Sequence, residues 1–162
     1  MSLLEVDGLT VGVERSPEML LREVGFTVNR GEVMGLVGES GSGKTMASLA
    51  IMGLLPLGIE QRAGSVRIEG RELVDVETGV VERSAADMTM IFQHPRGALN
   101  PTMRVGAQIA RALGINQGAN RAAARGRSLE MRSHVGIPGA RRVARAYPHQ
   151  LSGGMCQRVM IA

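Results

Sequence analysis

The feature that most constrains the fold of this chain is the glycine-rich segment Gly38–Thr45, which reads GESGSGKT. It fits, at every fixed position, the pattern of a glycine, any four residues, a glycine, a lysine and a serine or threonine. The apolar run before it, 32–37, predicts a buried strand, and the run after it, 46–52, predicts a helix that ends at Gly53 and Pro56. A glycine loop between a strand and a helix holds a polyphosphate through backbone N–H groups and the helix dipole.

The side chains of this loop predict two further contacts. Lys44 would reach the outer phosphates as a compact charge, and the Thr45 hydroxyl would ligate magnesium. Lys44 is the only lysine among the 19 cationic residues, although arginine serves at every other cationic position. A glycine turn without a ligand has no use for lysine and threonine here. The predicted nucleotide-binding residues are Gly38, Ser40, Gly41, Ser42, Gly43, Lys44 and Thr45.

Composition limits the class of protein. The chain has 162 residues, enough for one domain or part of a larger one, and only two phenylalanines and one tyrosine, which argues against a stacking surface for single-stranded nucleic acid. Its one cysteine, Cys156, excludes an internal disulfide, and no signal segment is present, so we expect a cytosolic protein. The longest apolar stretch, 46–57, is too short to span a bilayer.

Positive charge gathers in the last quarter of the chain. Residues 121–162 hold eight arginines against Glu130 alone, a net charge of +7, whereas residues 1–120 have a net charge of −3. This pattern suits either a nucleic-acid face or a solvated helical surface whose acidic partners lie on another chain. We favour the second interpretation and expect no nucleic-acid partner.

Strand patterns predict an antiparallel layer in the first part of the chain. Apolar runs at 3–6 and 9–11 flank Asp7–Gly8, which we expect to form a turn, and 21–28 and 64–70 predict two more strands.

The second half of the chain is predicted to be mainly helical. One more buried strand is expected at 88–92, where it delivers Gln93 to the edge at which ligands bind in α/β sheets. The predicted helices begin at Val105, with Val105, Ile109 and Leu113 on one face, and then cover about 120–135, 141–146 and 155 to the C-terminus.

Three motifs then stand in a fixed order: Gly38–Thr45, Ile91–Gln93 and Leu151–Arg158. Together they resemble the phosphate loop, glutamine loop and signature of the ATP-binding-cassette (ABC) ATPases. The flanking sequences resemble the ATPase subunits of oligopeptide and dipeptide importers; they are 90–95, 99–106 and 147–150.

The resemblance implies an α/β fold, a P-loop NTPase of the ABC-ATPase type with an N-terminal antiparallel β layer, a partial parallel sheet and a helical subdomain, incomplete at the C-terminus. Residues 1–162 would be the N-terminal part of one nucleotide-binding domain. Within it, 1–99 would be the β layer and phosphate-loop core, 100–152 the helical subdomain, and 153–162 the start of the signature helix.

The resemblance also implies roles outside the phosphate loop. Gln93 would position the attacking water and Mg²⁺, although a strand-end glutamine can also bond its own loop. The signature residues would face the terminal phosphate of ATP bound by a second ATPase subunit; they are Ser152, Gly153, Gly154 and Gln157. Two glycines weaken a helix by about 1 kcal/mol each. This cost is explained if the N–H groups of the first turn bind an anion.

The implied partners are ATP, Mg²⁺, a second ATPase subunit and transmembrane permease subunits, which would hold the chain at the cytoplasmic face of the membrane. For His94, Tyr147 and His149 we expect packing or capping. Cys156 replaces the basic residue usual in relatives and is expected to be a tolerated departure.

Two departures from the family pattern limit the expected activity. No aromatic residue lies near Val13, where relatives stack one on adenine, and no acidic residue follows Glu130. The Walker B aspartate, the catalytic glutamate and the switch histidine are therefore missing from the sequence, and we expect no hydrolysis by this chain alone. An importer ATPase subunit is the leading hypothesis. A non-hydrolysing nucleotide-binding remnant is the alternative, and a cassette protein acting on nucleic acid is disfavoured.

Overall fold

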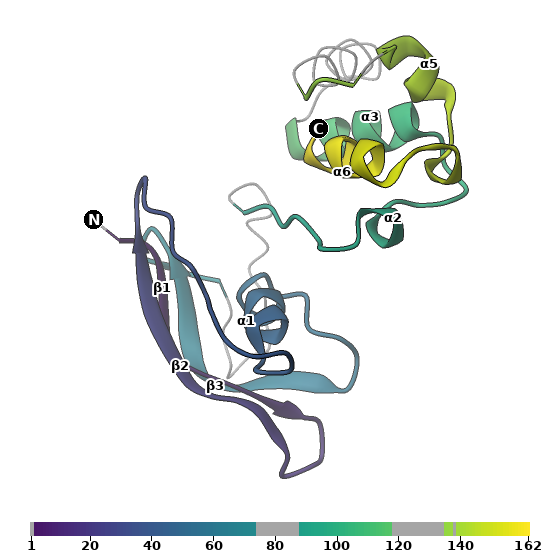
Figure 1. Cartoon of the computed structure of the whole chain (residues 1–162). Coiled ribbons are helices and arrows are strands. Elements are labelled where there is room, and N and C mark those ends of the chain that lie inside the picture. The colour runs from purple at the N-terminus through teal and green to yellow at the C-terminus, as the bar shows by residue number, and fades with distance from the viewer. Residues whose placement is uncertain (1, 74–87, 118–134, 138) are drawn as a thin grey trace. The chain divides into compact units, whose positions relative to one another are not determined.

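The computed structural model of the chain describes residues 2–73, 88–117, 135–137 and 139–162. These residues fall into two compact units, Met1–Met88 and Thr89–Ala162. Each unit has its own hydrophobic core, built on a sheet and one helix in the first and on helices alone in the second (Figure 1). None of the described helices is long and apolar enough to span a lipid bilayer.

The first unit contains an antiparallel sheet of four strands in the order β2-β1-β3-β4. The strands are β1 (Ser2–Val13), β2 (Met19–Asn29), β3 (Ile59–Ile68) and β4 (Arg71–Glu72). β1 is central and pairs with both β2 and β3 (Figure 1), while β4 is a short edge strand. The predicted antiparallel layer is confirmed.

The turn expected at Asp7–Gly8 is wrong, because β1 runs unbroken through these residues. The strand register shifts here against both neighbours, which marks a bulge. Gly8 has φ +59° and lies against Gly64 of β3. A Cβ added to Gly64 would approach the Gly8 carbonyl carbon to 2.4 Å. Two glycines in contact across the ladder therefore allow a bulge at a place where the sequence suggested a hairpin.

Helix α1 (Lys44–Ile51) packs on one face of this sheet (Figure 1). Its small buried residues, Ala47 and Ala50, are 3% and 1% exposed and bring the helix close to β-strand side chains such as Leu9. The helix ends at Ile51, with Met52 as its C-cap, and the predicted break follows at Gly53. Gly53 has φ +64° and donates its N–H to the Ala50 carbonyl.

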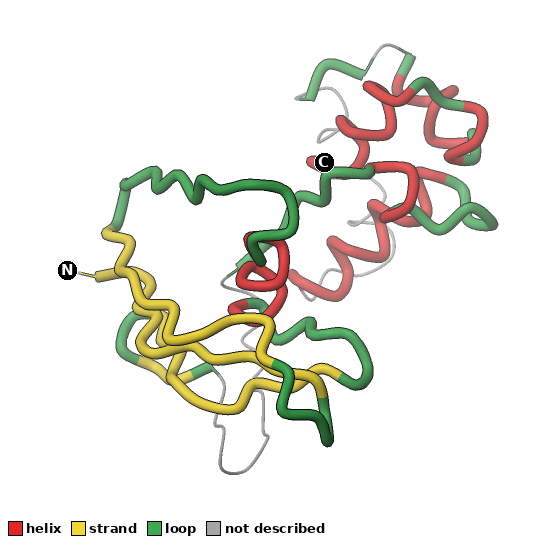
Figure 2. The backbone as a smooth tube through the Cα atoms, turned by 60° about the horizontal axis from the view of Figure 1, so that its bottom comes forward, coloured by secondary structure: helices red, strands yellow, loops and turns green. Residues whose placement is uncertain are grey.

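The two buried strands expected at 32–37 and 88–92 do not form. Val33 and Val37 are 97% and 93% exposed, and Figure 2 shows the whole connection from β2 to α1 as loop. A strand buried on both faces needs neighbouring strands and covering helices. The described residues supply only an antiparallel sheet, so the predicted partial parallel sheet is missing from this part of the chain.

The second unit is helical. Its elements are α2 (Pro95–Ala98), α3 (Val105–Gln117), α5 (Ala140–Arg145), the 3₁₀ turn η1 (Pro148–Gln150) and α6 (Gly153–Ile161). The core brings Val105 and Ile109 of α3 against Val143 of α5 and Val159 of α6. The helices predicted from Val105, at 141–146 and at the C-terminus are confirmed. Nearly all of the helix expected at 120–135 lies outside the described residues.

Candidate nucleotide-binding site

The glycine loop leads directly into α1, whose first residue is Lys44. The conformation of the loop requires a glycine at position 43, because Gly43 has φ +88°. Gly43 is the N-cap residue of α1, and no side chain caps the helix there. A Cβ on Gly43 would lie 2.6 Å from Cδ2 of Leu21, a buried β2 residue that pairs with Val11 of β1. The sheet therefore holds the loop at the start of the helix, even though the strand expected before the loop is missing.

Lys44 extends back over its own loop. Its Nζ donates hydrogen bonds to the Gly38 carbonyl at 2.8 Å, the Glu39 carbonyl at 2.6 Å and Ser42 Oγ at 3.2 Å. The ammonium group therefore already lies beside the loop backbone, at the end of a flexible stem. Phosphate oxygens carry more negative charge than these carbonyls and can replace them as acceptors.

Backbone donors at the start of α1 are free to bind an anion. Within the described residues, no acceptor is found for the N–H groups of Gly41, Gly43, Lys44 or Thr45. The first turn of α1 contains no acidic residue that would compete with a bound anion. Free N–H groups at a helix N-terminus, with an ammonium beside them, form an anion site.

Thr45 is exposed, and no bond to its hydroxyl is found in the described part of the chain. The same residues include no cluster of three His, Cys, Asp or Glu side chains that could bind a metal. Magnesium commonly takes only one or two protein ligands, with phosphate oxygens and water completing its shell. The Thr45 hydroxyl fits that mode of binding, in which the nucleotide itself supplies most of the ligands.

The structure places the other predicted site residues in the second unit. Gln93 is exposed in the segment before α2, and no bond to its side chain is found among the described residues. The neighbouring His94 is the N-cap residue of α2, and its carbonyl accepts from the Gly97 and Ala98 N–H groups. The structure thus gathers the phosphate-loop residues but does not bring Gln93 into the same unit.

The signature residues lie at the start of α6. Ser152 is the N-cap, and its Oγ accepts a hydrogen bond from the Met155 N–H at 3.3 Å. Gly153 and Gly154 are exposed, and an added Cβ at either would meet nothing within 4 Å; Gln157 is exposed as well. Packing within this unit therefore does not require either glycine.

The signature is positioned by side chains whose contacts were not predicted from the sequence. Arg96 of α2 donates to the Leu151 carbonyl at 2.9 Å, and Gln150 Oε1 accepts from the Tyr147 N–H at 2.8 Å. The Cys156 thiol, fully buried, donates to the Pro148 carbonyl at 3.5 Å. No sequence signal marks Arg96, because its acceptor lies 55 residues away.

The aromatic residues near the signature serve packing. The rings of Tyr147 and His149 stack with centroids 5.7 Å apart, and Arg104 lies 5.9 Å from the Tyr147 centroid. These contacts agree with the packing role expected for Tyr147 and His149, whereas His94 occupies the N-cap position of α2 without a side-chain cap bond.

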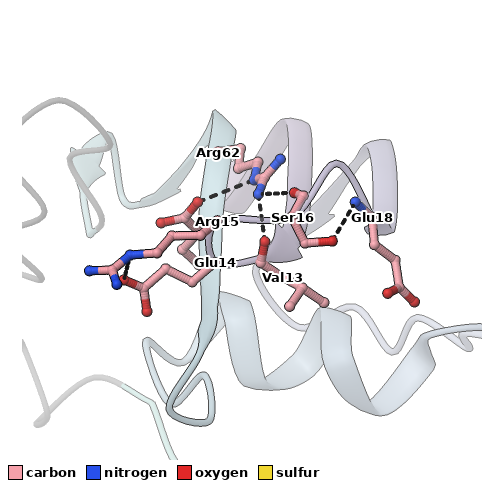
Figure 3. Close-up of polar contacts among 7 residues, drawn as sticks. Val13, Glu14, Arg15, Ser16, Glu18 and Arg62 are labelled. Carbon is pink, nitrogen blue, oxygen red and sulfur yellow. Dashed lines mark hydrogen bonds and ion pairs between the residues drawn. The ribbon is translucent and has the colours of Figure 1, made fainter.

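The turn after Val13 is held by Arg62 of β3 (Figure 3). Nη2 of Arg62 donates to the carbonyls of Val13 and Ser16 at 2.6 Å each. Nε lies 3.2 Å from Glu60 Oε1, an ion pair without hydrogen-bond geometry. Sequence reasoning missed this arginine because its acceptors lie 49 and 46 residues away.

Comparison with known proteins agrees with this geometry. The family model described as "ABC transporter" matches residues 21–162. The dipeptide transport ATP-binding protein DppD of Escherichia coli is 44% identical over 165 residues, which cover 100% of this chain and 50% of DppD. The oligopeptide transport ATP-binding protein OppD of Salmonella typhimurium is 41% identical, with 99% of this chain and 48% of OppD covered. The chain thus spans about half the length of the curated relatives it matches.

Solved structures share the fold. The ATP-binding cassette MJ0796, in a dimeric post-hydrolysis state bound to ADP and Pi, superposes with a TM-score of 0.76 at 24% identity, covering 98% of this chain and 67% of that one. An ATP-binding subunit of an ABC transporter gives a TM-score of 0.71 at 28% identity, over 99% of this chain and 60% of the other. The chain belongs to the ABC transporter family and has the fold of its ATP-binding domain, with sequence similarity to dipeptide and oligopeptide importer ATPases.

Proposed function

We propose that this chain binds ATP as the nucleotide-binding part of an ATPase subunit that powers the import of peptides or similar solutes. One observation carries the proposal. The loop before α1 presents N–H groups, including those of Gly41 and Gly43, that have no acceptor among the described residues and lie beside the Lys44 ammonium. No acidic side chain lies in the first helical turn.

The chemistry of binding follows from these contacts. ATP phosphates would accept from the free N–H groups and from Lys44, which would exchange its bonds to the Gly38 and Glu39 carbonyls for bonds to phosphate oxygens. Magnesium, carried in with the nucleotide, would take the Thr45 hydroxyl as a protein ligand. Gln93 would approach the metal and the attacking water only when the two units are arranged around the nucleotide.

Two assemblies are part of the proposal. Ser152, Gly153, Gly154 and Gln157 would bind the terminal phosphate held by a second ATPase subunit, which accounts for two exposed glycines that packing does not require. Permease subunits would hold the pair at the cytoplasmic face of the membrane. Support comes from similarity to transport ATP-binding proteins and from the dimeric state described for MJ0796.

A second candidate is a nucleotide-binding remnant that does not hydrolyse ATP. It is favoured by the exposed segment 32–37, which has no sheet partner within the described residues. Phosphoryl transfer to water needs a group that orients the water and a complete metal shell. The two candidates share the binding step and differ only in turnover.

The test is titration of the purified chain with a fluorescent ATP analogue and magnesium, beside Lys44→Ala and Arg22→Ala. Arg22 is an exposed cation of β2, so its variant is a matched control for the loss of one charge. We expect binding by the wild type and by Arg22→Ala, and at least about tenfold weaker binding by Lys44→Ala, since a charge-assisted contact contributes about 1.5–3 kcal/mol. Equal affinities for all three proteins would reject nucleotide binding at this loop. Magnesium-dependent ATP hydrolysis by the wild type would reject the remnant.

A further inference from the structure

Helix α5 (Ala140–Arg145) presents a compact set of arginines to solvent. Arg141, Arg142 and Arg145 are exposed, whereas Val143 is 3% exposed and belongs to the core of the second unit. At about 100° per residue, the three arginines span about 100° of the helix circumference, opposite the buried valine. We call Arg141, Arg142 and Arg145 the α5 arginine face.

No counter-charge in the described part of the second unit neutralises this face. The three ion pairs of the described residues all lie in the first unit. In the sequence, residues 89–162 contain eleven arginines and one acidic residue, a net charge of +10, whereas residues 1–88 have a net charge of −6. The α5 arginine face therefore belongs to a strongly positive part of the sequence.

Three other arginines of the unit have structural contacts, whereas Arg111 of α3 and the arginines of the α5 face have none among the described residues. Arg96 and Arg158 donate to the backbone carbonyls of Leu151 and Gly136, and Arg104 lies over the Tyr147 ring. For Arg141, Arg142 and Arg145, no bond is found within the described residues. Structural contacts thus account for Arg96, Arg104 and Arg158, but they do not account for the three arginines of the α5 arginine face.

We propose that the α5 arginine face binds the anionic headgroups of membrane phospholipids and so holds the second unit against the membrane surface. Arginine close to an anionic bilayer gains about fivefold in binding for each charge, so three give on the order of a hundredfold. Because such attraction needs no pocket, an exposed convex helix face is sufficient.

Lipid is favoured over nucleic acid for two reasons. The aromatic rings next to α5 in the sequence, Tyr147 and His149, stack on each other, so bases cannot insert between them without breaking this contact. The choice also rests on the proposed function, which places the chain beside permease subunits at the membrane. An anionic bilayer is then the extended acidic surface nearest to the chain.

The test is cosedimentation of the full chain with phosphatidylcholine vesicles, with and without phosphatidylserine. The variant Arg141→Gln/Arg145→Gln removes two charges from the face. Its control, Arg15→Gln/Arg22→Gln, removes two exposed charges from the first unit. Glutamine keeps much of the side-chain length and adds no negative charge to the C-terminal turn of α5, so helix stability is little affected. A thermal melt of each variant checks this.

We expect the wild type and the control to bind anionic vesicles alike, in a salt-sensitive manner, and the α5 variant to bind at least about tenfold more weakly. Equal binding by both variants, or equal binding to neutral and anionic vesicles, would overturn the proposal. A different outcome would assign the face to nucleic acid: the wild type binds duplex DNA but no vesicles, and Arg141→Gln/Arg145→Gln loses the DNA binding. Lys44→Ala should bind vesicles normally but not the ATP analogue, which separates this inference from failure of the nucleotide site.

Discussion

Replacing Gly43 by alanine tests whether the geometry of the loop, and not only its charge, creates the nucleotide site. Gly43 has φ +88°, and an added Cβ would lie 2.6 Å from Leu21 Cδ2 and 3.5 Å from the Leu20 carbonyl oxygen. The left-handed backbone costs a non-glycine residue about 1–2 kcal/mol. Overpacking against a buried side chain adds about 1–3 kcal/mol. The native loop conformation should therefore become less favourable by about 2–5 kcal/mol.

The expected consequence is a change in affinity. If the loop leaves its native conformation to relieve this strain, the free N–H groups no longer converge, and Kd for the ATP analogue should rise by about thirtyfold or more. Gly41→Ala is the matched control, because Gly41 has φ +86° but open space around its Cβ position. That variant should weaken binding by about five- to thirtyfold from backbone strain alone.

Fluorescence titration of the wild type and both variants, with circular dichroism to check the sheet and helices, measures the effect. If Gly43→Ala binds the analogue as tightly as Gly41→Ala, contact with Leu21 does not set the loop conformation and the reasoning fails. If both variants bind like the wild type, the left-handed loop is not the conformation that binds nucleotide.

Three further predictions concern the stability of each unit. Arg62→Ala should lower the free energy of unfolding by about 1–3 kcal/mol, measured by urea denaturation, because the Val13 and Ser16 carbonyls lose a charged donor; a change no larger than that of Arg22→Ala would contradict the role of Arg62. Gly64→Ala should lower the free energy of unfolding by more than about 2 kcal/mol, since its Cβ would meet the Gly8 backbone at 2.4 Å. Gly70→Ala, at φ +77° in open space, should lower it by about 1–2 kcal/mol. Equal melting temperatures for these two variants would count against a bulge held by Gly8 and Gly64. Gly154→Ala should raise the melting temperature by an amount equivalent to about 0.5–1 kcal/mol, because the position is helical and open; a loss of stability would show that this glycine is needed for the fold.

The parts of the fold that were predicted correctly depend on local sequence. The loop before α1 is specified by Gly43 and Lys44, and the stop at Gly53 by its left-handed backbone, so neighbouring residues are enough to find them. The helices of the second unit follow from apolar spacing, as at Val105 and Ile109. These signals do not require knowledge of distant partners.

The parts that were wrong depend on distant residues. The run 32–37 has the composition of a buried strand, but burial requires strands beside it, and the described residues contain none in a parallel arrangement. Similarly, Asp7–Gly8 looks like a turn in the sequence and becomes a bulge because Gly64 faces it across the ladder. The role of Arg62 was missed for the same reason, since its side chain donates to carbonyls that lie far away in the sequence, in the turn after Val13.

The candidate site was predictable in its chemistry and less so in its assembly. Lys44, Thr45 and the loop glycines were found from their spacing and lie together at the start of α1. Gln93 and Ser152 occur in the second unit, and their approach to the nucleotide remains part of the proposed function. A motif identifies the residues of a site, but bringing together motifs from two units requires their relative arrangement.

The central claim is that free backbone N–H groups of the glycine loop bind the phosphates of ATP. The most direct measurement is a titration of isotope-labelled chain with magnesium and ATP, followed by amide NMR shifts. We predict large shifts for the Gly41, Gly43, Lys44 and Thr45 amides and none for α5, for example at Val143. If these loop amides did not move while ATP bound elsewhere, or if no amide moved at saturating ATP, the account of this site would be contradicted.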